Sequence, residues 1–94
     1  MRRRLTLSDF KRAILRLHGA RARVVSGESA VVRGGDEAHR EVSVLIFELI
    51  DHPTARRCYA WEADGRVVTV LHTRSADSPQ AAVRSAYPGS HATS

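Results

Sequence analysis

Residues 41–50 read EVSVLIFELI and form the strongest strand signal in this chain of 94 residues. Apolar side chains occupy both odd and even positions between Val42 and Leu49, so both faces of the expected strand are apolar. A strand that is apolar on both faces normally lies in the centre of its sheet. Pro53 ends the segment soon afterwards, because proline cannot donate a hydrogen bond to a neighbouring strand. The sequence therefore predicts a buried central strand at residues 41–50.

Two more strands are expected downstream, at residues 57–62 and 66–72. The dipeptide Asp64-Gly65 lies between them and is a strong signal for a two-residue hairpin turn. With these two residues in the turn, Trp61 faces Val68 across the hairpin. The signal upstream of the central strand is weaker, and residues 24–32 are compatible with either one strand or a short hairpin.

A helix is expected on each side of these strands. The first helix, at residues 5–19, begins with Thr6 as its N-cap and Asp9 three residues later, which is a variant of the capping box. Its apolar stripe consists of Leu7, Phe10, Ile14 and Leu17. The second helix opens at residues 77–79, which read Asp-Ser-Pro, and stops at residues 88–89, which read Pro-Gly.

The order helix, strands, helix predicts a small α+β fold. We expect three or four antiparallel strands, with both helices packed on one face of the sheet. The other face would then be exposed to solvent or used for self-association. We also expect one domain at residues 5–87, a basic tail at residues 1–4 and a disordered tail at residues 88–94. Which hairpin face belongs to the core stays open, because a one-residue shift of register exchanges the two faces.

The positive charge of the chain is concentrated at its N-terminal end. Residues 1–23 carry eight Lys or Arg against one Asp, a net charge of +7, whereas residues 24–94 carry seven Arg against nine Asp or Glu, a net charge of −2. Such a segment can bind the phosphates of a nucleic acid or another anionic partner. Its alternative role is a solvated helix face that binds nothing. The residues expected to make an anion contact are Arg2, Arg3, Arg4, Lys11, Arg12 and Arg16.

A second group of candidate residues lies in the downstream hairpin. In the expected register one face carries Arg57, Tyr59, Trp61 and His72, which could stack on a flat ligand or form part of the core. Cys58 and His72 together suggest a small-ligand or enzymatic site, but no recognised nucleophile motif surrounds them. The chain has no second cysteine and no paired-histidine spacing, so we expect no metal, no cofactor and no catalytic residue.

Composition indicates the cellular setting. The single cysteine cannot form a disulfide within the chain, which fits a reducing compartment. No apolar stretch approaches the roughly 20 residues of a transmembrane helix, and no signal-peptide pattern follows the N-terminal arginines. Fourteen Arg against one Lys favour a bacterium with a GC-rich genome. We therefore expect a cytoplasmic bacterial protein with no membrane partner.

Three segments of the C-terminal half carry a family resemblance. They read DHPTARRCYAW at residues 51–61, VLH at residues 70–72 and DSPQAAVR at residues 77–84. With them the chain resembles a group of small uncharacterised bacterial single-domain proteins. The resemblance implies a small antiparallel α+β domain and brings no activity, cofactor or catalytic residue.

The function expected from these patterns is non-catalytic. We expect a domain that acts through protein–protein contacts and forms a homodimer, because a strand that is apolar on both faces leaves apolar surface to cover. The first alternative is nucleic-acid or anion binding through residues 1–23. The second is a small-ligand or enzymatic site near Cys58 and His72.

Overall fold

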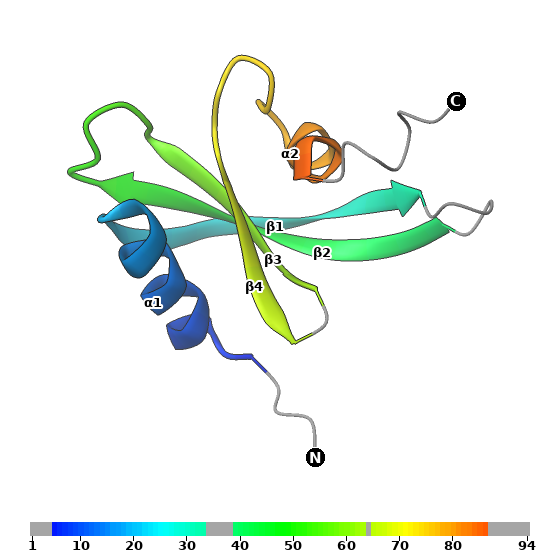
Figure 1. Ribbon diagram of the computed structural model, residues 1–94, viewed down its shortest axis with the longest axis horizontal. Helices are drawn as coiled ribbons and strands as arrows, with labels where there is room; N and C mark the ends of the chain where they lie inside the picture. The colour runs from blue at the N-terminus through cyan, green and yellow to red at the C-terminus, as the bar shows by residue number, and fades with distance from the viewer. Residues whose placement is uncertain (1–4, 34–38, 64, 87–94) are drawn as a thin grey trace.

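The computed structural model describes residues 5–33, 39–63 and 65–86 and folds them into two helices and one sheet (Figure 1). The elements in chain order are α1 (Leu7–His18), β1 (Arg21–Arg33), β2 (His39–Ile50), β3 (Arg57–Ala63), β4 (Arg66–Leu71) and α2 (Pro79–Ala86). The four strands are antiparallel and lie in the order β1-β2-β3-β4. The α+β fold is confirmed, and residues 24–32 belong to the single strand β1. The tails expected at residues 1–4 and 88–94 lie outside the described residues.

Only part of the long β1–β2 hairpin continues into the rest of the sheet. β1 pairs with β2 along its whole length, with a bulge between Val24 and Ser26. β2 pairs with β3 only from Leu45 to Glu48. β3 and β4 pair along their full length, with Trp61 opposite Val68 as predicted.

The two helices lie against opposite faces of the sheet. Phe10 of α1 shares a core cluster with Cys58, whereas Val83 of α2 shares a different cluster with Tyr59. Neighbouring residues of a strand point to opposite faces, so these two clusters lie on the two sides of the sheet. We call them the α1-side core and the α2-side core. The α1-side core consists of Phe10, Ile14, Ala20, Ala22, Phe47, Leu49, Ala55, Cys58 and Ala60. The α2-side core consists of Ala30, Val44, Ile46, Tyr59, Trp61, Ala76, Ala82 and Val83.

The expected placement of both helices on one face is therefore not confirmed. The reason lies in β2, where Val44 and Phe47 are both fully buried although they point to opposite faces. The buried central strand is confirmed, but each face is covered by a helix of the same chain. No second copy is needed to bury the second apolar face.

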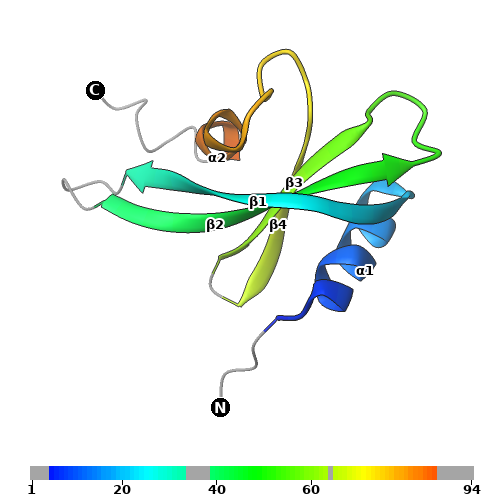
Figure 2. The same cartoon turned by 180° about the vertical axis from the view of Figure 1, so that it is seen from behind.

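The twist of the sheet lets two short helices cover both faces. β3 and β4 cross the β1–β2 hairpin steeply, and α1 and α2 lie towards opposite ends of that hairpin and on opposite sides of it (Figures 1 and 2). Both helices contact both edge strands, β1 and β4. Such crossing follows from the right-handed twist of the strands, which accumulates across a sheet.

Helix α1 packs through its middle turns. Phe10 and Ile14 are buried, and the Phe10 ring stacks on that of Phe47 with centroids 6.4 Å apart. Leu7 and Leu17, the outer residues of the expected stripe, are 42% and 51% exposed. The stripe prediction is wrong at these two positions, because each lies about one turn beyond the part of the helix that contacts the core.

Candidate anion-binding surface

The outward side of α1 carries three exposed basic side chains, Lys11, Arg12 and Arg16. We call these three residues the α1 basic surface. A helix advances about 1.5 Å per residue, so the three Cα positions lie within roughly 8 Å along the helix axis. The structure thus brings together the contact residues expected from α1, whereas residues 2–4, which hold the other three, lie outside the described residues.

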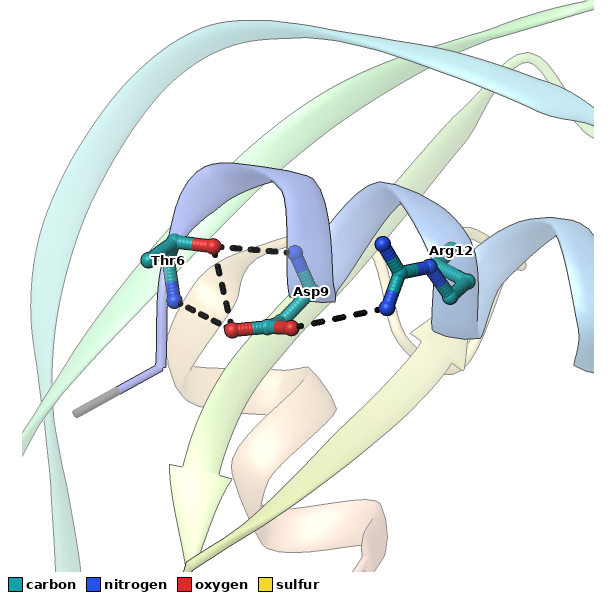
Figure 3. A network of polar contacts seen from close by, with 3 residues as sticks. All are labelled: Thr6, Asp9 and Arg12. Atoms are coloured by element: carbon teal, nitrogen blue, oxygen red, sulfur yellow. Dashed lines mark hydrogen bonds and ion pairs between the residues drawn. The ribbon is translucent and has the colours of Figure 1, made fainter. Parts of the chain in front are cut away.

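Hydrogen bonds at both ends define α1. Thr6 Oγ1 accepts a hydrogen bond from the Asp9 N–H (3.3 Å), and Asp9 Oδ2 accepts from the Thr6 N–H (2.8 Å) and hydroxyl (3.0 Å) (Figure 3). This capping box confirms the one expected from the sequence. At the other end, Gly19 has a φ of 69° and donates its N–H to Leu15 O at 2.9 Å. Glycine adopts this left-handed conformation without steric cost.

Asp9 moderates the positive charge on one side of the α1 basic surface. Its Oδ1 lies 3.9 Å from Arg12 Nη1, and the Arg12 side chain is 76% exposed (Figure 3). An ion pair at this distance with an exposed arginine is weak, so the Arg12 guanidinium stays available to another anion. In the described part of the chain, neither Lys11 nor Arg16 lies within ion-pairing distance of a carboxylate.

Arg21 and Arg23 do not extend this surface, although they follow α1 closely in sequence. Ala22, between them, belongs to the α1-side core, so the two arginine side chains point to the other face of the sheet. There Arg23 forms an ion pair with Glu48. The described basic residues of segment 1–23 are thus divided between the outward side of α1 and the α2 side of the sheet.

The second candidate group, Arg57, Tyr59, Trp61 and His72, is only partly accessible. Trp61 is fully buried and Tyr59 is 2% exposed, so both rings are core residues rather than a ligand face. The Tyr59 hydroxyl lies 2.7 Å from His72 Nδ1, and His72 is half-buried. Arg57 is exposed at the start of β3.

Charged groups from three segments influence the pKa of Tyr59. Burial raises the pKa of Tyr59, the nearby Arg57 guanidinium opposes that shift, and the carboxylates of Asp77 and Glu28 add to it. The tyrosine therefore stays protonated and able to donate to His72. This arrangement joins β3 to the segment after β4, and within the described part of β3 and β4 it leaves no open aromatic platform.

Cys58 and His72 do not form a common site. The Cys58 thiol lies in the α1-side core, whereas His72 bonds to Tyr59 on the α2 side. Burial raises the pKa of Cys58 to about 12. A thiol that stays protonated is a poor nucleophile. The described contacts of Cys58 and His72 thus lie in different clusters and give no support to a common site near them.

A histidine contact between α1 and β4 was missed at the level of sequence. His18 Nε2 lies 2.7 Å from Thr69 Oγ1, across a separation of 51 residues. Burial lowers the pKa of His18, and the nearby His52 lowers it further. His52 Nδ1 accepts backbone hydrogen bonds from Ala55 (2.9 Å) and Thr54 (3.2 Å), which holds its ring in place. The sequence marks His18 only as a residue of the last helical turn and contains no signal for its partner.

Comparisons and searches for other kinds of site gave negative results. No protein-family model, curated protein or solved structure matches this chain. Within residues 5–33, 39–63 and 65–86, no three His, Cys, Asp or Glu side chains are grouped so that they could hold a metal ion. Neither helix in those ranges is long and apolar enough to span a membrane.

Proposed function

We propose that this chain is a non-catalytic nucleic-acid-binding domain that contacts duplex phosphates through the α1 basic surface. The observation that carries the proposal is the exposure of Lys11, Arg12 and Arg16 on one capped helix. Arg2, Arg3 and Arg4 precede that helix in the sequence and would add further phosphate contacts. Contacts of this kind bind duplexes without reading the bases.

The packing of α1 favours nucleic acid over a lipid surface. A helix that lies on a membrane inserts its apolar face among the acyl chains. In α1 the middle of that face, Phe10 and Ile14, is committed to the α1-side core, and only its ends at Leu7 and Leu17 are exposed. The basic face remains for a partner that offers phosphates rather than acyl chains.

Because helices cover both faces of the sheet, the functions expected from the sequence are ranked differently here. Self-association through an open sheet face was the leading expectation, but α2 packs on the face that would have served. The inaccessible Cys58 likewise favours a non-catalytic role. A bacterial, cytoplasmic setting fits the single, reduced cysteine and the strong preference for arginine over lysine.

A salt titration tests the proposal. Binding of a generic DNA duplex, measured by fluorescence anisotropy, should weaken as salt rises, with a slope of log K against log salt of about −3 to −5 for three to six phosphate contacts. Replacing Lys11, Arg12 and Arg16 by Gln should make the slope shallower by about 3.

The matched control removes the same charge elsewhere. Arg21, Arg74 and Arg84 are exposed and lie outside the α1 basic surface, and their replacement by Gln should leave most of the slope intact. An equal reduction of the slope in both triple variants would mean that binding depends only on net charge. That outcome, or no binding even at low salt, would contradict the proposal.

A further inference from the structure

A side-chain amide of α2 occupies part of the edge formed by β1. The Val31 N–H donates to Gln80 Oε1 at 2.9 Å, and Gln80 Nε2 donates to the carbonyl oxygen of Val31 at 2.9 Å. One carboxamide therefore satisfies both backbone groups of Val31. A residue of a neighbouring strand does the same in a hydrogen-bonded antiparallel pair. The Gln80 side chain thus takes the place of a further strand at this point of the edge.

The first turn of α2 is fixed on β1. The Ser78 hydroxyl accepts a backbone N–H of that turn at 3.1 Å, which caps the helix. Ala82 is fully buried in the α2-side core together with Ala30, the residue that precedes Val31. Gln80 is therefore held beside the residue that it bonds as long as α2 is docked.

The bonds to Gln80 also show which groups of β1 point away from β2. In an antiparallel pair, residues bonded to the neighbouring strand alternate with residues whose N–H and C=O point the other way. β1 pairs with β2 in an unbroken register from Ser26 to Arg33, and the bulge between Val24 and Ser26 interrupts the alternation. The outward-pointing residues of this stretch are therefore Gly27, Ser29, Val31 and Arg33.

The bulge and Gln80 together leave little of this edge free. Between them lie the outward-pointing groups of Gly27 and Ser29, to which no described residue bonds. That stretch spans about three residues, which is shorter than the usual strand of about five or six. Without the Gln80 contact the free edge extends from Gly27 to Arg33 and reaches the usual length. Bulges are a common protection of sheet edges, and here a side-chain amide completes that protection.

We propose that Gln80 is an autoinhibitory contact, which keeps β1 from pairing antiparallel with β1 of a second copy while α2 is docked. The amide and an added strand exclude each other, because both need the N–H and C=O of Val31. Movement of α2 away from β1 opens the edge, and docking of α2 closes it. The inference does not rest on nucleic-acid binding, because the α1 basic surface lies on the other helix.

A second β1 strand suits the opened edge in both geometry and charge. Strand addition of this kind binds through main-chain hydrogen bonds. A twofold axis at Ala30 places outward-pointing residues of the two copies opposite each other, as a hydrogen-bonded ladder requires. The charged residues of this stretch, Glu28 and Arg33, then lie opposite uncharged residues, so no like charges face each other.

Amide exchange in dilute solution tests the contact itself. Gln80→Ala removes both hydrogen bonds to Val31, so exchange of the Val31 amide, measured by NMR, should become about tenfold faster. Gln80 is only half-buried and alanine favours helices, so the variant should fold. Arg84→Ala shortens an exposed side chain one turn further along α2 and should leave the Val31 rate unchanged. An unchanged rate in Gln80→Ala, or an equal increase in Arg84→Ala, would overturn the proposal.

Sedimentation equilibrium with the same variants tests the autoinhibition. At high micromolar concentration Gln80→Ala should approach twice the 10.4 kDa chain mass, and exchange at the Gly27 and Ser29 amides should slow relative to the dilute sample. In the unaltered chain and in Arg84→Ala, these two amides should exchange at the same rate at every concentration. A Gln80→Ala variant that stays monomeric, or that associates without slower exchange at these amides, would refute the proposal. Concentration-dependent protection of the same amides in the unaltered chain would refute it as well, because Gln80 would then not block the edge.

Discussion

The placement of the helices on opposite faces predicts that mutations in the two cores act independently. Ile14 lies in the α1-side core and Val83 in the α2-side core, and both are buried. Ile14→Val removes one methylene group and should cost about 1 kcal/mol, whereas Val83→Ala removes two carbons and should cost about 2 kcal/mol. The two residues lie in different core clusters and share no contact. The double variant should therefore lose the sum of the two unfolding free energies, about 3 kcal/mol, within roughly 0.5 kcal/mol. The total stability expected for a chain of this length is about 5–14 kcal/mol, so the double variant should still fold.

Urea denaturation followed through the fluorescence of Trp61 measures these free energies. Trp61 is fully buried and is the single tryptophan of the chain, so its emission reports the loss of the core. A positive control comes from Phe10 and Phe47, whose rings are stacked. The pair Phe10→Leu and Phe47→Leu should show a coupling of at least about 0.5 kcal/mol. A coupling above about 1 kcal/mol between Ile14→Val and Val83→Ala would mean that the two helices share one core, and the opposite-face arrangement would be wrong.

Three more predictions follow from individual contacts. The pKa of His18 lies below its ordinary value of 6.5 through burial and His52, so the folded state favours the neutral ring. Stability should therefore be retained above pH 6.5 and fall as the pH drops below it, and His18→Gln should flatten this part of a urea-midpoint profile. Cys58, buried with a pKa raised to about 12, should react with an aromatic disulfide reagent at pH 8 only after urea unfolds the chain; prompt labelling of the native protein would contradict its placement. Thr6→Ala removes the capping hydroxyl and should cost about 1 kcal/mol, whereas Ser8→Ala in the same turn should cost much less, as thermal denaturation can show.

The local features of the fold were predictable from the sequence because each depends on residues close together in the chain. The Thr6–Asp9 capping box, the hairpin that places Trp61 opposite Val68 and the buried strand around Phe47 are all of this kind. The face chosen by α2 was not predictable. A strand that is apolar on both sides has the same sequence pattern whether a second helix or a second copy covers it. Only the long-range twist of the sheet decides between these outcomes.

The features of the candidate surfaces likewise differ in whether the sequence predicts them. Exposure of Lys11, Arg12 and Arg16 followed from their positions opposite the apolar side of one helix. The contact between His18 and Thr69 joins residues 51 positions apart and carries no pattern in the sequence. The position of β4 at an edge of the sheet likewise required the order of the strands, which the sequence left undecided.

The position of β3 between the two cores determines how the protein unfolds locally. Like the centre of β2, it contributes to both cores, because Cys58 and Ala60 are buried on one side and Tyr59 and Trp61 on the other. Each helix with its half of the β1–β2 hairpin can therefore detach as a separate cooperative unit, while exposure of β3 requires both units to open. Native-state hydrogen exchange should accordingly find two opening reactions of lower free energy, one for each helix. The amides of β3 should exchange only through global unfolding, so β3 is the part of the chain whose protection reports the stability of the whole.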